Sequence, residues 1–173
     1  MKTVGIIGGL GPETSAKFYL EIVSSCLKRN KTQRPPILIW NIPLPLKIEE
    51  GLLIRKNGGK RYIPFLIEAA KTLEKAGADF LVMPCNTMHI FIKEIRSAVK
   101  IPMLSIVDET ISLIKKRNSS KVGVLATSTT IDKLLARDRL KGIDTVTPNR
   151  KQQSRLDKII HNLVMGKRGS RDK

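Results

Sequence analysis

The sequence is poor in several residue types that mark particular classes of protein. It has only two cysteines, Cys26 and Cys85, too few for the disulfide framework of a small secreted domain, so a reducing cytoplasm is the expected setting. Aromatic residues make up 4% of the chain, which leaves few side chains for stacking on nucleic-acid bases. No apolar run approaches the length of a membrane span. The run 4–10 is short and glycine-rich, and it suits a first strand and turn better than a signal peptide.

Acidic residues are scarce relative to basic ones. The chain has 32 Lys and Arg against 15 Asp and Glu, a formal net charge of +17, which raises the possibility of a polyanionic partner. The basic residues are dispersed, however, over residues 28–34, 55–61 and 115–121 and the tail from Arg150 onward. We therefore favour solvated helix faces and loops over a nucleic-acid interface.

Short β-branched runs alternate along the chain with helical periods. The strands that we expect are 3–8, 37–41, 79–83, 101–106, 121–126 and 143–147. The helices that we expect are 13–28, 63–76, 88–99, 107–117, 130–140 and 153–165. Several strands are almost continuously hydrophobic, which favours sheets covered on both faces. The pattern predicts an α/β fold with mostly parallel sheets flanked by helices.

Two further features concern how the chain is organised. Residues 43–61 contain prolines followed by Asn57, Gly58 and Gly59, and predict a long mobile loop beside the strand ends, of the kind that closes over ligands. The run 4–8 recurs as 122–126, each copy followed by a turn of small residues and a helix. This repeat favours two similar lobes, although any two parallel strands can look alike by chance.

Residues 79–87 are the most informative stretch, because an apolar run ends at Cys85 and is followed by Asn86 and Thr87. The apolar spacing within 88–99 is helical, so Cys85 is expected where a strand gives way to a helix. The N–H groups and dipole at a helix start favour thiolate, the form that acts as base or nucleophile. They also suit a substrate carboxylate. The alternative is an inert small core residue, against which the polar neighbours argue.

Two other motifs receive weaker interpretations. Residues 8–12 resemble a phosphate loop, but they lack the G-x-G-x-x-G spacing, carry Pro12 where the helix would begin, and precede no Walker lysine, so nucleotide binding is disfavoured. His89 lies four residues after Cys85, on the same side of a helix. A lone histidine in a first helical turn is more often structural than catalytic.

Five stretches together resemble the aspartate/glutamate racemase family, specifically its aspartate racemase branch. They are residues 2–12, 77–79, 83–89, 101–102 and 125–127. The resemblance covers nearly the whole chain and implies two pseudo-symmetric α/β lobes, a first lobe 1–106 and an incomplete second lobe 107–173. It also implies racemisation without pyridoxal phosphate or metal, in which one cysteine thiolate removes the α-proton and a second thiol delivers a proton to the opposite face.

The resemblance also implies roles for individual residues. Cys85 matches a catalytic thiol, Asn86 and Thr87 match positions that hold the substrate carboxylate, and Leu10, Asn41 and Thr127 match strand-end positions at the cleft. For both Asn41 and Thr127, a structural role as turn former or helix cap is as well supported as a role at the cleft. A cation for the substrate's side chain would come from Lys47 or from residues 55–61.

The sequence departs from the family at one catalytic position. The family's second cysteine lies in a Gly-Cys-Thr-Glu motif that this chain does not contain, and Cys26 falls within a helical stretch remote from the strand ends. Thr129 also stands where the family usually has glycine. We expect an amino-acid racemase of the aspartate/glutamate type that needs no cofactor, acts on an acidic amino acid and forms a homodimer, with no membrane partner. The alternative is a catalytically impaired remnant that binds an acidic small molecule or a polyanion without turnover.

Overall fold

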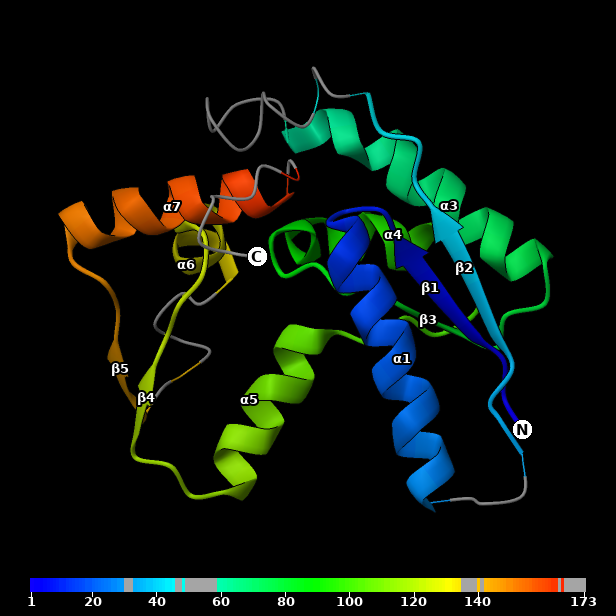
Figure 1. The fold of residues 1–173 in the computed structure, drawn as a ribbon, viewed down its shortest axis with the longest axis horizontal. Coiled ribbons are helices and arrows are strands. Elements are labelled where there is room, and N and C mark those ends of the chain that lie inside the picture. The colour runs from blue at the N-terminus through cyan, green and yellow to red at the C-terminus, as the bar shows by residue number, and fades with distance from the viewer. Residues whose placement is uncertain are drawn as a thin grey trace. The chain divides into compact units, whose positions relative to one another are not determined.

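The computed structural model describes residues 1–29, 33–45, 48, 59–134, 140, 142–164 and 166. The chain divides into two compact units, the first comprising Met1–Cys85 with Phe91–Ser105 and the second Asn86–Ile90 with Ile106–Lys173. Each unit contains a parallel β-sheet and helices (Figure 1), so the α/β prediction is confirmed. The second unit includes the segment Asn86–Ile90, which the predicted lobe boundary at 106/107 assigns to the first lobe.

The sheet of the first unit has its first strand in the middle. β1 (Val4–Gly8) pairs in parallel with β2 (Ile37–Asn41) on one side and with β3 (Phe80–Val82) on the other. All five residues of β1 are buried, as a central strand with helices on both faces requires. The prediction for β2 is confirmed to the residue, and those for β1 and β3 are confirmed with shorter ends.

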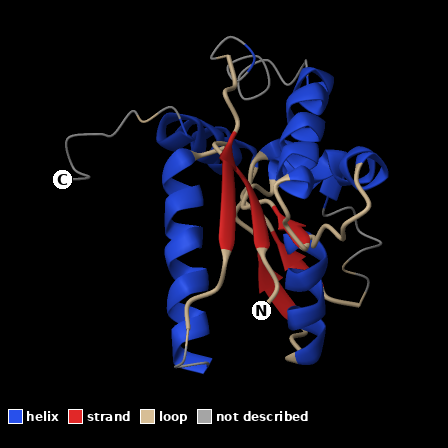
Figure 2. Ribbon diagram, turned by 90° about the vertical axis from the view of Figure 1, so that its right-hand side faces the viewer, coloured by secondary structure: helices blue, strands red, loops and turns tan. Residues whose placement is uncertain are grey.

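Helices pack on both faces of this sheet (Figure 2). α1 (Pro12–Arg29) brings Phe18 and Ile22 against Val4 and Ile6. Alternate residues of a strand face opposite sides, and on the other side α3 (Ile63–Lys75) packs closely over Gly5. A Cβ at Gly5 would lie 2.7 Å from Leu81 Cδ2 and 2.9 Å from Ala78 Cβ. Glycine is therefore required at this position by space.

The strand predicted over residues 101–106 is wrong. Only a single bridge joins Leu81 to Met103, with Leu81 N donating to Pro102 O at 2.8 Å and Leu104 N donating to Leu81 O at 2.9 Å. Pro102 has no N–H for a ladder. The guanidinium of Arg96 takes the carbonyl of Met103, at 3.1 Å from Nε and 2.9 Å from Nη2. A continuous strand is therefore replaced by one bridge.

The helix predicted over residues 88–99 is wrong at its start. A 3-10 helix, Thr87–Phe91, comes first, and the α-helix α4 begins only at Ile92 and ends at Ala98. The division between the two units falls within this stretch, after Ile90. His89 is 1% exposed, and its Nε2 accepts a hydrogen bond from Ile106 N at 3.3 Å. That bond ties the 3-10 turn to the start of α5 (Ile106–Lys116).

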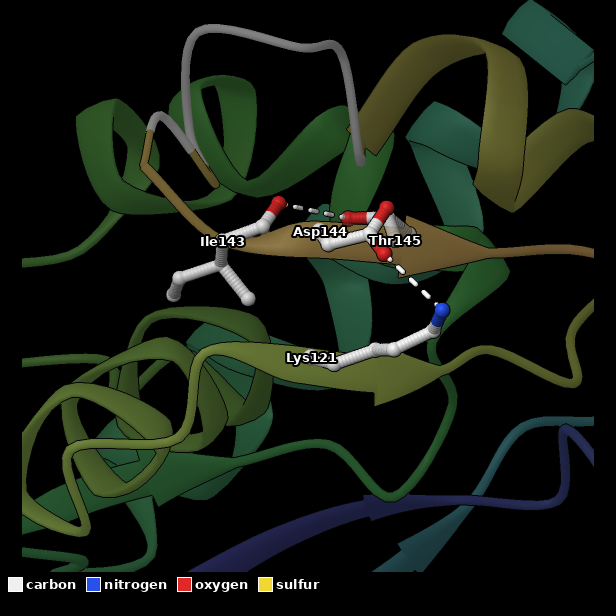
Figure 3. A network of polar contacts seen from close by, with 4 residues as sticks. All are labelled: Lys121, Ile143, Asp144 and Thr145. Atoms are coloured by element: carbon white, nitrogen blue, oxygen red, sulfur yellow. Dashed lines mark hydrogen bonds and ion pairs between the residues drawn. The ribbon is translucent and has the colours of Figure 1, made fainter.

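The second unit is built on two parallel strands. β4 (Lys121–Gly123) pairs with β5 (Asp144–Val146), and Lys121 lies opposite Asp144. Their side chains form an ion pair, Nζ to Oδ2 at 3.1 Å (Figure 3). Both side chains are more than 60% exposed, so the pair contributes little to stability. The two strands are shorter than the predictions 121–126 and 143–147.

The helices of the second unit are α5 (Ile106–Lys116), α6 (Ser128–Leu134) and α7 (Arg150–Val164). Buried Val107 and Ile111 of α5 form a core cluster with Leu140. The C-terminal part of the predicted helix 130–140, and most of the predicted loop 43–61 with Lys47 and Arg55, lie outside the described residues. Within the described part of the chain, no helix is long and apolar enough to cross a membrane.

Candidate active site

Three residues predicted for the site lie at one edge of the first unit's sheet. Because β1, β2 and β3 are parallel, their carboxyl ends meet at the same edge, where ligands bind in open α/β sheets. Leu10 follows the end of β1 by two residues, and Asn41 is the last residue of β2. Cys85 follows the end of β3 by three residues. The topology thus places a thiol, an amide and an apolar side chain on neighbouring strand ends.

The turn that carries Leu10 is held by a serine that the sequence analysis missed. Ser15, in the first turn of α1, is 6% exposed. Its hydroxyl accepts a hydrogen bond from Gly9 N at 3.1 Å and donates to Gly11 O at 3.2 Å. Gly9 has φ +87°, and a Cβ there would lie 2.9 Å from Asn41 Oδ1. The turn is therefore fixed against the end of β2.

Cys85 lies in a tight turn beyond β3. It is a half-buried thiol outside any disulfide, and its N–H donates to Met83 O at 2.8 Å. A 3-10 helix follows it rather than an α-helix, so the dipole that the sequence analysis placed beside this sulfur is weaker than expected. Thiolate activation at Cys85 stays a prediction.

Cys26 lies far along α1 from the strand ends. It is the fifteenth residue of this helix, which begins just after the carboxyl end of β1 and runs back along the sheet (Figure 1). At 1.5 Å per residue, Cys26 is about 21 Å along the axis from Pro12. The expectation that Cys26 is remote from the strand ends is confirmed.

In the second unit three threonine hydroxyls form a cluster. Thr87 Oγ1 lies 3.0 Å from Thr127 Oγ1 and 3.1 Å from Thr130 Oγ1, and the last two are 2.9 Å apart. Thr127 caps α6, since its hydroxyl accepts a bond from Thr130 N at 3.2 Å in the manner of an N-cap. The cap interpretation of Thr127 is confirmed, and its hydroxyl also contacts Thr87. Thr130, which is 3% exposed, was missed; the T-x-x-T spacing was its only signal.

Asn86 and His89 take different places around this turn. Asn86 is exposed, and its carbonyl accepts the N–H of His89 at 3.1 Å. His89 is buried and its Nε2 is committed to Ile106 N, so the structural interpretation of His89 is confirmed. Among the residues that the structure describes, no group of three or more His, Cys, Asp or Glu is placed to hold a metal ion.

Two polar residues of α7 hold the loop that leads into α6, and the sequence analysis named neither as part of a site. Gln153 Nε2 donates to Ala126 O at 2.8 Å and to Asp157 Oδ1 at 3.0 Å. Asp157 accepts bonds from the N–H of Ser128, at 2.9 Å, and from its hydroxyl. The four-residue spacing puts both side chains on one helix face, which was the available signal.

Comparison with known proteins identifies the family. The model of the Asp/Glu/hydantoin racemase family matches residues 7–171, nearly the whole chain and all the strand ends described above. The chain belongs to this family. The resemblance found in the sequence is thereby confirmed.

Individual proteins of known sequence or structure also resemble this chain. The broad specificity amino-acid racemase RacX of Bacillus subtilis is 35% identical over 143 residues, which is 80% of this chain and 60% of RacX. An aspartate racemase homologue of Pyrococcus horikoshii superposes with a TM-score of 0.69 at 30% identity, covering 92% of this chain and 70% of that one. The aspartate racemase of Picrophilus torridus gives a TM-score of 0.73 at 25% identity, covering 96% and 76%. The chain thus spans about 60% of the length of the curated relative that it matches.

Proposed function

We propose that this chain carries cofactor-independent racemase chemistry on an acidic amino acid, with Cys85 as the thiol that exchanges the α-proton. The observation that carries the proposal is the position of Cys85 at the sheet edge that also holds Leu10 and Asn41. Membership of the Asp/Glu/hydantoin racemase family supports it. So does the name of RacX, an amino-acid racemase.

Each neighbouring residue has a proposed part in binding. Asn86 and Thr87 would donate hydrogen bonds to the substrate's α-carboxylate, as their types allow. Thr127 supports Thr87, because their hydroxyls are 3.0 Å apart. Leu10 and Asn41 would line the ligand on neighbouring strand ends. The cations proposed for the substrate's side chain, Lys47 and residues 55–61, lie mostly outside the described residues.

The proposed step at Cys85 is a proton transfer. The thiolate takes the α-proton, the C–H electron pair stays on the α-carbon, and the adjacent carboxylate and its hydrogen-bond donors stabilise the added charge. Inversion then needs an acid on the opposite face. Losing a general acid or base typically costs about 10²- to 10⁴-fold. In this sequence the other thiol, Cys26, lies about 21 Å along α1 by the helical rise.

This position of Cys26 favours a second candidate, a catalytically impaired protein that binds the acidic amino acid without turnover. In the first candidate Cys85 exchanges the α-proton with solvent, and in the second no exchange occurs. With one thiol, the same face is deprotonated and reprotonated, so solvent deuterium enters without a change of configuration. We therefore propose that exchange exceeds inversion in this chain.

Proton NMR in D₂O tests the proposal. L-aspartate and L-glutamate are incubated with purified protein, loss of the α-proton signal is followed, and the D-isomer is measured by chiral chromatography. Cys85→Ser should abolish exchange, whereas Cys26→Ser, the matched change on α1, should leave it intact. Absence of exchange in the unmodified protein would favour the binding candidate. Exchange that survives Cys85→Ser would refute the role of Cys85, and D-isomer forming as fast as deuterium enters would show a second acid.

A further inference from the structure

A cavity of about 220 Å³ lies within the second unit, beside its core cluster. α5 contributes Val107, Ile111 and Ile114 to its wall, and β4 with the loop after it contributes residues 122–126. Leu140 adds a further apolar side chain. Apart from three polar residues, the described part of the wall is made of aliphatic side chains and backbone.

The size of the cavity limits what it accommodates. The cavity opens to solvent on one side, since Leu125 in its wall is 80% exposed and Asn86 is exposed too. An apolar cavity of about 150 Å³ is large enough to stay dry and to bind benzene. Pockets for drug-sized ligands begin at about 300 Å³. The cavity of about 220 Å³ therefore fits one phenyl ring or a branched aliphatic side chain.

Among the described residues of the wall, the polar groups are few and uncharged. They belong to Asn86, Thr110 and Thr130, and the hydroxyl of Thr130 is part of the cluster with Thr87 and Thr127. None of the described residues that line the cavity is charged. A carboxylate placed among these described residues would lose its hydration without gaining a cation from them. The described part of the lining thus favours an apolar side chain over an acidic one.

We propose that this cavity binds the apolar side chain of an amino-acid ligand, phenyl or branched aliphatic, with Asn86 and Thr130 at the polar end of the site. That the ligand is an amino acid rests on the proposed function; the apolar preference rests on the lining alone. Asn86 directly follows Cys85 in the sequence. The range of ligands then extends beyond aspartate and glutamate to amino acids such as phenylalanine and leucine.

Methyl NMR of the full chain tests this directly. Benzene, L-phenylalanine and L-leucine are titrated against protein labelled at its isoleucine and valine methyl groups, with glycine and L-aspartate as comparison ligands. The first three should shift the methyl signals of Ile111, Ile114 and Val124, and the last two should not. The variant Ile114→Trp fills the cavity and should weaken binding by more than about tenfold, because the buried ring area is lost. Leu113→Trp is its control, the same change at a neighbouring position that is 51% exposed and outside the lining.

The outcomes separate this proposal from the proposed function. Absence of shifts with benzene and L-phenylalanine, or equal binding by both tryptophan variants with native circular dichroism, would overturn it. So would benzene binding without L-phenylalanine binding, since the cavity would then be an unoccupied void. L-phenylalanine binding in a protein that exchanges no α-proton would leave the cavity proposal standing and count against the racemase chemistry. Exchange of the α-proton of L-aspartate, together with no methyl shifts from benzene or L-phenylalanine, would support the racemase chemistry and overturn the cavity proposal.

Discussion

Asp157 of α7 accepts hydrogen bonds from both the backbone N–H and the hydroxyl of Ser128, the first residue of α6. The carboxylate therefore occupies the exposed donors at this helix start, a place that attracts anions. Gln153, one helical turn earlier, holds Ala126 O and the same carboxylate. The loop that carries Thr127 is thus fixed from both ends by α7.

Asp157→Ala should destabilise the protein because it leaves the N–H and hydroxyl of Ser128 without their acceptor. Loss of a partner from a buried or half-buried donor costs about 1–3 kcal/mol. Asp157→Asn, which keeps one oxygen acceptor, should cost less. Urea denaturation followed by circular dichroism measures both. Ser154→Ala, an exposed position on the same helix, is the control and should stay within about 0.5 kcal/mol; an equal loss there would contradict the prediction.

Gly9→Ala should destabilise the first unit more than Gly77→Ala does. Both glycines have positive φ, +87° and +93°, so both substitutions carry the backbone cost of about 1 kcal/mol or more. A Cβ at Gly9 would also lie 2.8 Å from Ile42 N, whereas nothing lies within 4 Å of one at Gly77. The difference between the two free energies of unfolding in urea isolates this steric contribution. An equal loss of unfolding free energy in both variants would show that the turn at Gly9 relaxes around the new Cβ without a steric penalty.

Thr130→Val should cost about 1 kcal/mol, because it keeps the side-chain shape but removes the hydroxyl that bonds to Thr87 and Thr127. Thr145→Val is the matched control, since Thr145 is exposed on β5 and its hydroxyl bonds only weakly, at 3.3 Å, to Ile143 O. Chemical denaturation of both variants is the measurement. A cost at Thr145 as large as that at Thr130 would show that the threonine cluster adds no stability.

Cys85 should react with iodoacetamide faster than Cys26 and remain reactive below about pH 8.5, the value for a free thiol. The expected cause is stabilisation of the anion by the polar groups of Asn86 and Thr87, with a smaller helix contribution than the sequence suggested. Peptide mass spectrometry across pH gives the two rates in one sample. Equal rates at both cysteines, which are both half-buried, would rule out activation of Cys85.

The basic surface should bind nucleic acid only weakly and without sequence preference. On α7, Arg150, Lys151, Arg155 and Lys158 line one exposed hollow with Ser154. Filter binding with two unrelated duplexes should give similar affinities that fall steeply as salt rises. Lys151→Glu should lower the salt slope by about 1, and Lys2→Glu, the same change on the first unit, should have a smaller effect. Tight, sequence-dependent binding at physiological salt would contradict the prediction.

The elements of the fold follow from local patterns that a single segment carries. The run 37–40 is apolar and contains the β-branched residues Ile37 and Ile39, and β2 forms over 37–41. The apolar run before Cys85 forms β3. This local pattern was enough to predict that the thiol lies at a strand end. The helical period predicted the first residue of α3, Ile63, and predicted its last residue to within one position. Such signals depend only on neighbours in sequence.

Where the predictions fail, the backbone is limited by groups that the hydrophobic period does not report. The strand expected over 101–106 reduces to one bridge, and Pro102, which faces β3 there, has no N–H with which to extend the pairing. The helix expected over 88–99 begins as a 3-10 turn in which His89 accepts the N–H of Ile106, 17 residues away. Neither effect is visible in the periodicity of the segment that it alters.

The sequence by itself determined the α/β class, the family and the position of Cys85 at a strand end, because hydrophobic period and motif are properties of contiguous residues. Tertiary structure alone decided which side chains meet. Thr87 and Thr127 are 40 residues apart, and Ser128 and Asp157 are 29 residues apart. A hydrogen bond needs a donor and an acceptor about 3 Å apart, and no local rule brings such pairs together before the helices and strands have packed.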